Sequence, residues 1–138
     1  ILSGLVGSEM CIRDSITVFC YGLMVNYCLQ AADILANDGI DAEVVDLRTV
    51  YPLDKATIIE RSQRTGKVLL VTEDNLEGSI MSEVSAIIAE NCLFDLDAPI
   101  MRLAAPDVPS MPFSPTLENE IMMNPEKIQD KMRELAQF

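Results

Sequence analysis

The sequence of 138 residues contains no histidine. This absence excludes the Ser–His–Asp and Cys–His pairs of nucleophilic enzymes and zinc sites with histidine ligands. It also removes the side chain that most often exchanges protons at neutral pH. Lysines and arginines number 10 against 22 aspartates and glutamates, a net charge of −12. This balance argues against a nucleic-acid partner, which needs clustered positive charge. It points instead to solubility or to a basic protein partner.

Tryptophan is absent, and aromatic residues make up only 5% of a chain that is 49% hydrophobic. Such a composition is typical of an aliphatic α/β core. A chain of this length predicts one domain that buries roughly two thirds of its unfolded surface. The opening fifteen residues, ILSGLVGSEMCIRDS, lack the basic start and the long apolar run of a secretory signal. Charged side chains interrupt their apolar stretches, so we expect no membrane segment and no membrane partner.

The string VGSEMCIRDS resembles the translated remnant of a sequencing adaptor. We therefore expect residues 1–15 to be a non-native leader and residues 16–138 to form the domain; an ordinary ragged N-terminus is the alternative. The four cysteines, Cys11, Cys20, Cys28 and Cys92, contain no C-x-x-C pair. We expect them to be small buried apolar residues in a reducing cytoplasm.

Strand-like and helix-like patterns alternate from Ile16 onward. The predicted strands are residues 16–22, 42–48, 67–74 and 99–105. Between them, apolar residues recur at helical spacing, with Asp54 as an N-cap and Thr65-Gly66 as a stop. Strands separated by helices imply right-handed crossovers and a mainly parallel sheet. The expected fold is therefore a three-layer α/β/α sandwich whose mainly parallel sheet has about five strands.

Four prolines between residues 106 and 115 dominate the segment PDVPSMPFSPTLENE, and we expect that segment to be extended and irregular. Asn124-Pro125 then predicts the start of a last helix, with asparagine as the cap and proline in the first turn. Ile128, Met132 and Leu135 recur on one side of that helix. The adjacent Met122-Met123 pair is interpreted as packing.

Acidic side chains gather where the predicted strands end, which is where parallel sheets bind ligands. Glu73, Asp74 and Asp107 could hold a hard cation such as Mg²⁺. The favoured alternative is that they are solvated ends of buried strands, with Arg48 pairing one of them. Gly78-Ser79 before a helix could bind an anion, but Ser79 acting as an N-cap explains this step more simply.

Glu43 and Asp46 lie three apart on one strand and therefore face opposite sides, which excludes an acid–base pair. No catalytic constellation emerges from the residues alone. Six segments, in order and spacing, nevertheless resemble the C-terminal domain of the beta subunit of thiamine-diphosphate-dependent 2-oxo acid dehydrogenases, the transketolase C-terminal fold. They are ITVFCYG, VVDLRTVYPLD, TGKVLLVTED, GSIMSEVSAIIAEN, LDAPIMRLAAPDVPSMPFSPTLE and NPEKI.

The resemblance implies part of an oxidoreductase that decarboxylates a 2-oxo acid oxidatively and transfers the acyl group to lipoamide. Thiamine diphosphate and Mg²⁺ serve such an enzyme, but they are held by domains other than this one. No catalytic, cofactor-binding or metal-binding residue is therefore expected in this chain. The implied partners are the alpha subunit, a second beta subunit and the subunit-binding domain of the dihydrolipoyl acyltransferase. We expect Asp130, Glu134 and Phe138 to form part of the acyltransferase contact; a frayed terminal turn is the alternative.

Two positions depart from the family pattern. Thr72 stands where many relatives have histidine, and Gly78-Ser79-Ile80 replaces a Gly-Gly-Phe type of loop. The second departure places the sequence near branched-chain or fused alpha/beta forms. Two other functions stay open: the C-terminal domain of transketolase or deoxyxylulose-phosphate synthase, and a free-standing flavodoxin-like binding protein.

Overall fold

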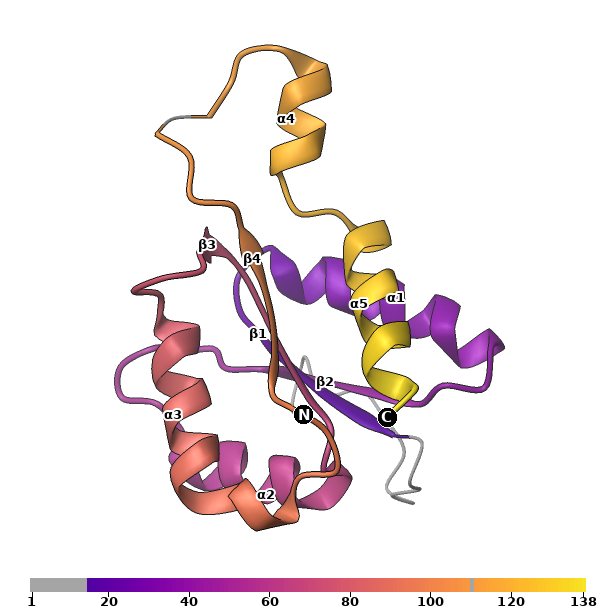
Figure 1. The fold of residues 1–138 in the computed structure, drawn as a ribbon, viewed down its shortest axis with the longest axis vertical. Coiled ribbons are helices and arrows are strands. Elements are labelled where there is room, and N and C mark those ends of the chain that lie inside the picture. The colour runs from indigo at the N-terminus through magenta and orange to yellow at the C-terminus, as the bar shows by residue number, and fades with distance from the viewer. Residues whose placement is uncertain (1–14, 110) are drawn as a thin grey trace.

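The structure is a computed structural model that describes residues 15–109 and 111–138 (Figure 1). Within this part of the chain, four parallel strands form one sheet in the order β2–β1–β3–β4. The strands are β1 (Ile16–Cys20), β2 (Ala42–Asp46), β3 (Val68–Asn75) and β4 (Met101–Ala105). The expected count of about five strands is therefore one too high for the described residues. The proline-rich segment after β4 does not add a strand, because proline lacks the N–H that a sheet ladder requires.

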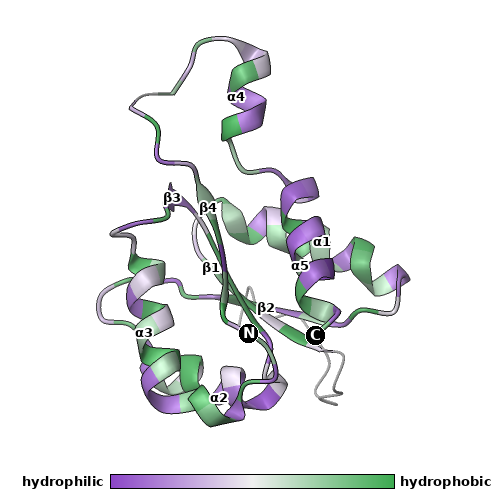
Figure 2. Ribbon diagram, in the orientation of Figure 1, coloured by the Kyte–Doolittle hydropathy of each residue, from purple (hydrophilic) through white to green (hydrophobic). Residues whose placement is uncertain are grey.

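Helices cover both faces of the sheet, which confirms the three-layer sandwich. Helices α1 (Met24–Asn37) and α5 (Pro125–Ala136) lie together on one face, and α2 (Lys55–Thr65) and α3 (Ile80–Cys92) lie on the other (Figure 1). Hydrophobic residues, green in Figure 2, occur on all four helices, and the buried ones pack with those of the strands. Two clusters of buried side chains result, one on each face of the sheet. The side chains of β1 are buried along its whole length, as expected of a central parallel strand.

Local signals set several helix boundaries as predicted. The carboxylate of Asp54 accepts the backbone N–H of Thr57 at 3.1 Å and begins α2. Gly66 ends the same helix in the left-handed conformation, with φ of 71°. Asn124 caps α5 by accepting the N–H of Lys127 at 2.8 Å. Because each cap is a contact within three residues, the sequence pattern alone predicts it.

A short helix, α4 (Pro115–Ile121), interrupts the segment that was expected to be extended throughout. Pro115 occupies the first turn of this helix, where a missing N–H has no cost. The segment projects beyond the C-terminal edge of the sheet, away from the rest of the molecule (Figure 1). None of the residues of α4 is buried.

Three cysteines, Cys20, Cys28 and Cys92, are free thiols and are buried, as predicted. A hydrogen bond to Cys20, together with burial, raises the pKa of Cys28 well above its ordinary value. Burial likewise raises the pKa of Cys92. A raised pKa keeps the thiols of Cys28 and Cys92 protonated at neutral pH, which makes them poor nucleophiles. Cys11 and the leader predicted for residues 1–15 fall, apart from Ser15, outside the described residues.

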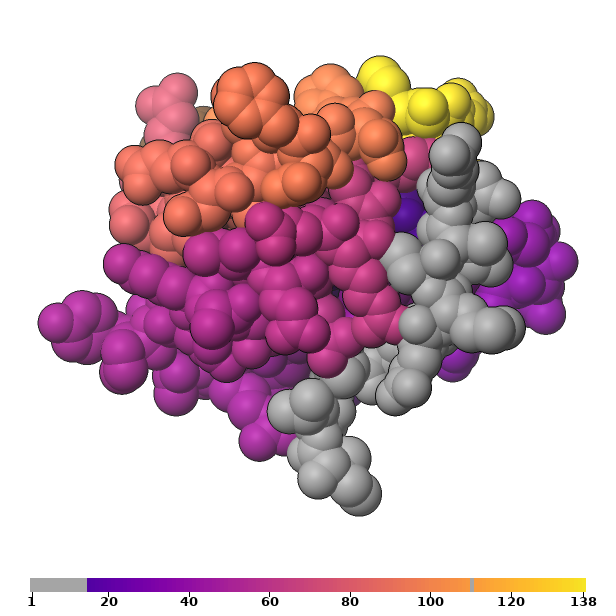
Figure 3. All heavy atoms as spheres, turned by 90° about the horizontal axis from the view of Figure 1, so that it is seen from below, coloured from indigo at the N-terminus to yellow at the C-terminus, as the bar shows by residue number. Residues whose placement is uncertain are grey.

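No helix in the described ranges is long and apolar enough to span a membrane. Seen from below, α2 and the segment formed by α3 and the short 3-10 helix η1 (Leu93–Asp95) lie side by side (Figure 3). The C-terminal residues reach the same end of the molecule (Figure 3). The end of α5 and the projecting α4 therefore lie at opposite ends of the structure.

Candidate functional site

The C-terminal edge of the sheet carries a small polar network rather than a catalytic pair. The hydroxyl of Tyr21, just after β1, donates to Asp74 Oδ2 at 3.1 Å and lies 3.0 Å from Thr72 Oγ1. Thr72 is buried, and its hydroxyl oxygen accepts the backbone N–H of Asp74 at 3.1 Å. Burial, with the carboxylates of Asp74 and Glu73 acting in the same direction, raises the pKa of Tyr21. The network links β3 to the residue that follows β1.

The acidic residues at this edge do not form the hypothesised Mg²⁺ site. Glu73, Asp74 and Asp107 are all exposed. In the part of the chain that the structure describes, no three metal-ligating side chains come close enough to share an ion. The carboxylate of Asp46, at the end of β2, accepts the backbone N–H of Arg48 at 2.9 Å. The exposure of Glu73, Asp74 and Asp107 agrees with the alternative interpretation, that they are polar ends of buried strands. The pairing of Arg48 with one of them stays a prediction.

The structure confirms that Ser79 lies at the N-cap position of a helix, but not that its side chain caps the helix. Ser79 occupies the N-cap position of α3 with an extended backbone, and Gly78 has φ of 73°. The Ser79 side chain, however, makes no capping hydrogen bond. Instead, the backbone carbonyl of Ser79 accepts the N–H of Ser82 at 3.0 Å. Ser79 therefore marks the start of the helix without the contact that was expected to stabilise it.

A buried carboxylate lies near the opposite end of the sheet. Glu43 on β2 is 6% exposed, and its Oε1 lies 2.9 Å from Arg61 and 3.8 Å from Arg64, both on α2. Thr17 on β1 donates its hydroxyl to Glu43 at 3.4 Å and shares a 2.8 Å hydrogen bond with Thr65. Burial raises the pKa of Glu43 even though both arginines act to lower it. This cluster attaches the end of α2 to the sheet and is structural.

The three residues expected at a docking surface are all exposed on or just after α5. The buried side of α5 consists of Ile128, Met132 and Leu135, as predicted. Asp130 and Glu134 are four residues apart and therefore lie along one side of the helix. Their side chains are 83% and 54% exposed, and Phe138 is 62% exposed.

The carboxylates of Asp130 and Glu134, on the exposed face of α5, already have cationic neighbours within the chain. Glu134 pairs with Lys131 at 2.9 Å, and Asp130 lies 3.8 Å from Arg133. Arg133 also binds Asp38, at the end of α1, at 2.9 Å. A partner at this surface therefore competes with existing ion pairs rather than meeting free charges.

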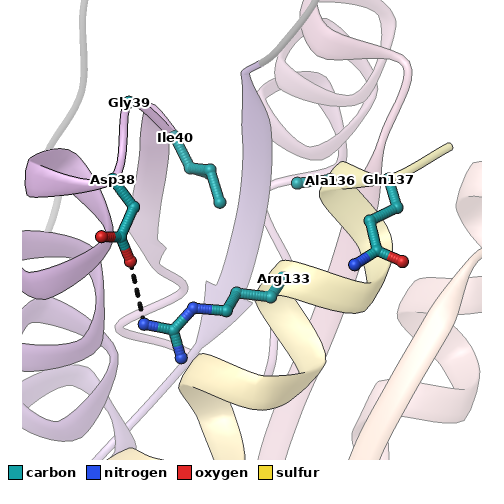
Figure 4. Close-up of a pocket in the computed structure, with 6 residues that line it drawn as sticks. All are labelled: Asp38, Gly39, Ile40, Arg133, Ala136 and Gln137. Atoms are coloured by element: carbon teal, nitrogen blue, oxygen red, sulfur yellow. Dashed lines mark hydrogen bonds and ion pairs between the residues drawn. The ribbon is translucent and has the colours of Figure 1, made fainter.

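A groove of about 330 Å³ runs beside this face (Figure 4). The Asp38–Arg133 ion pair crosses one side of it, and Gln137 projects on the other (Figure 4). Lys67, a buried residue, donates its ammonium to the carbonyl of Ala136, one of the residues that line the groove, at 3.3 Å. Sequence reasoning missed both contacts, because Asp38 and Arg133 lie 95 positions apart and Lys67 and Ala136 lie 69 apart. Together they fix the end of α5, which places Phe138.

Comparison with known proteins extends this description. A family model, "Transketolase, C-terminal domain", matches residues 9–128. The chain belongs to this family. It is 67% identical over 125 residues, 91% of its length, to the 2-oxoisovalerate dehydrogenase subunit beta of Bacillus subtilis. It is 38% identical over 122 residues, 88% of its length, to the mitochondrial pyruvate dehydrogenase E1 component subunit beta of Dictyostelium discoideum.

This transketolase C-terminal domain spans 38% and 34%, respectively, of those two relatives. Among solved structures, a split-gene transketolase, described as an inactive beta4 tetramer, superposes with a TM-score of 0.78. That match covers 96% of this chain and 42% of the transketolase chain, at 22% identity, and it shows the shared fold. The resemblance found in the sequence to beta subunits of pyruvate and branched-chain 2-oxo acid dehydrogenases is thus confirmed.

Proposed function

We propose that this chain is the assembly and docking domain of the beta subunit of a 2-oxo acid dehydrogenase acting on branched-chain substrates. The observation that carries the proposal is the 67% identity over 125 residues to a 2-oxoisovalerate dehydrogenase beta subunit. The parent reaction is the oxidative decarboxylation of a 2-oxo acid with acyl transfer to lipoamide. Since the named relative is bacterial, we place the enzyme in a bacterial cytoplasm.

The residues described do not fit thiamine diphosphate or its Mg²⁺. The C-terminal edge of the sheet, where a parallel fold binds ligands, carries the exposed carboxylates of Glu73, Asp74 and Asp107. Negative charge at this edge repels a diphosphate, and the three carboxylates are not gathered around a common point. We therefore assign the cofactor to other parts of the parent enzyme, and we assign no catalytic step to this chain.

The outer face of α5 is the proposed contact with the subunit-binding domain of the acyltransferase. It combines an exposed aromatic residue, Phe138, with the carboxylates of Asp130 and Glu134. Charged residues at the rim of an interface mainly raise the rate of association, and an aromatic residue supplies contact area. The alpha subunit and a second beta subunit are the other proposed partners.

Binding of the chain to a purified subunit-binding domain tests this proposal. Leu135 is buried, so a truncation that reaches it would disturb the core; the test removes only Gln137 and Phe138. We expect this truncation to weaken binding at least tenfold, because removal of an aromatic anchor from an interface costs about 2 kcal/mol or more. The Asp130→Asn/Glu134→Gln variant should slow association and flatten its dependence on salt.

The matched control is Glu83→Gln/Glu90→Gln, which removes two exposed carboxylates from α3 on the other face of the sheet. Because the net charge changes equally, a general electrostatic effect would appear in both double variants. Unchanged affinity after truncation, together with equal salt dependence in both double variants, would refute docking through α5.

A further inference from the structure

The segment of residues 111–122, here called the arm, projects from the body of the domain (Figure 1). It contains α4, which has seven residues, none of them buried. Isolated helices of this length are unstable in water, because their few hydrogen bonds do not offset the cost of nucleation. The ammonium of Lys127 contacts the carbonyls of Asn119, Glu120 and Met122 and so holds the end of α4. The arm is therefore a defined element whose side chains are left uncovered.

Large apolar side chains line the arm. Phe113 is fully exposed, Leu117 is 51% exposed and Met111 is 50% exposed. Figure 2 shows hydrophobic residues on α4 where no other element covers them. At the base of the arm, Met111 and Met122 border a hollow of about 60 Å³ next to Leu23 at the start of α1. The apolar surface thus continues from the arm onto the body of the domain, as at protein interfaces.

The charges of this region are of one sign. Residues 103–126 include no lysine or arginine, whereas Asp107, Glu118, Glu120 and Glu126 are acidic. Lys127, the next cation along the chain, is engaged with the main-chain carbonyls at the end of α4. A second copy of a chain with a net charge of −12 is a poor match for such a surface. An apolar groove bordered by lysine or arginine is complementary to it.

We infer that the arm is a second interface, separate from the α5 face. It places Phe113 and Leu117 in an apolar groove bordered by basic residues on the alpha subunit of the parent enzyme. This inference rests on the proposed function. The apolar side chains supply contact area, and Glu118 and Glu120 pair with the basic rim. The arm lies at the opposite end of the structure from the end of α5, so both surfaces can be occupied at once (Figure 1).

The test uses the Bacillus subtilis 2-oxoisovalerate dehydrogenase beta subunit with its matching segment replaced by this chain, mixed with the alpha subunit of the same enzyme. The arm variant is Phe113→Ser/Leu117→Ser. Its matched control is Leu93→Ser/Phe94→Ser, which removes the same two residue types from η1, where they are 58% and 100% exposed. Association is followed by sedimentation, and hydrogen exchange of α4 is measured before and after mixing.

We expect the arm variant to weaken association at least tenfold, with a change of less than twofold in the control. Exchange of α4 should be fast in the beta subunit alone and slow in the assembly. The Glu118→Gln/Glu120→Gln variant should flatten the salt dependence of association. Equal assembly by the arm variant and the control variant would overturn the inference. Slow hydrogen exchange of α4 in the beta subunit before mixing would also overturn it, because the beta subunit would then cover its own arm.

These outcomes separate the inference from the proposed function. A chimera that assembles normally while the arm variant has no effect leaves the proposed function intact and refutes the arm interface. A chimera with unmodified arm that does not assemble with the alpha subunit contradicts both. Self-association of the 138-residue chain that the arm variant abolishes would identify a second copy as the occupant and would also refute the inference.

Discussion

Replacing Arg61 by methionine should destabilise the chain by about 3 kcal/mol at neutral pH. Glu43 is buried, and Arg61 is the nearer of its two cationic neighbours, at 2.9 Å against 3.8 Å for Arg64. Removing one partner of a buried ion pair costs about 3–5 kcal/mol. Arg61 Nε, however, is buried and has no hydrogen-bond partner among the described residues, and methionine removes that unsatisfied donor, which recovers about 1 kcal/mol. The loss of the ion pair less this recovery gives the expected destabilisation of about 3 kcal/mol.

The loss should depend on pH in a defined direction. Burial raises the pKa of Glu43 above its ordinary value of 4.5, and Arg61 opposes that rise. A carboxyl group with a raised pKa holds its proton more tightly in the folded than in the unfolded chain. Its contribution to stability is therefore present below pH 4.5 and is lost as pH rises through the folded-state pKa. Without Arg61 that pKa rises further, so the variant should approach the wild type in stability as the pH falls toward 4.5.

Urea denaturation followed by circular dichroism, at pH 7 and near pH 5, measures both effects. The Glu43→Gln/Arg61→Met double variant should recover most of the stability lost at pH 7, because it leaves no uncompensated buried charge. Arg64→Met, which removes the more distant and more exposed arginine, should cost less than about 1 kcal/mol. A loss that is the same at both pH values, or a double variant as unstable as Arg61→Met, would refute this account of the cluster.

Two further predictions concern the ends of α2. Asp54→Ala should reduce the free energy of unfolding by about 1 kcal/mol at pH 7. Because hydrogen bonds from Thr57 lower the pKa of Asp54, this contribution is lost as the pH falls below 3.8, the ordinary pKa of the group. Urea titrations at two pH values can check both statements. Gly66→Ala should cost more than about 1 kcal/mol, because its Cβ would lie 2.7 Å from Asp97 Oδ2 at a φ of 71°. Gly39→Ala, with φ of 81° and no atom within 4 Å of the added Cβ, is the control and should cost less in thermal and urea unfolding.

The parts of the fold that local chemistry determines were predictable from the sequence. Asp54 and Asn124 each cap a helix through a contact three residues away, and Gly66 ends a helix through its own backbone conformation. Apolar spacing also identified the buried side of α5. Such features require only the periodicity of a helix and the chemistry of its ends.

Features that depend on long-range contacts or on competing local signals were not predictable. The frequent prolines of residues 106–115 indicated an extended segment, yet Pro115 is itself the first residue of α4. Nothing in the sequence links Asp38 with Arg133, because the packing of α5 beside α1 brings them together. At the candidate docking face, the family resemblance indicated Asp130 and Glu134, but their cationic neighbours emerged only from the structure.

Those neighbours make the two proposed interfaces electrostatically different. At the α5 face, Lys131 and Arg133 already neutralise part of the negative charge, so a basic partner exchanges one set of ion pairs for another. At the arm, Lys127 is engaged with main-chain carbonyls, and the carboxylates of Glu118 and Glu120 belong to a stretch without basic residues. Salt screens the long-range attraction between two partners, and a carboxylate beside a counter-ion in its own chain contributes less to that attraction than an uncompensated one. Association through the arm should therefore depend more steeply on ionic strength than docking through α5, although both surfaces belong to the same acidic domain.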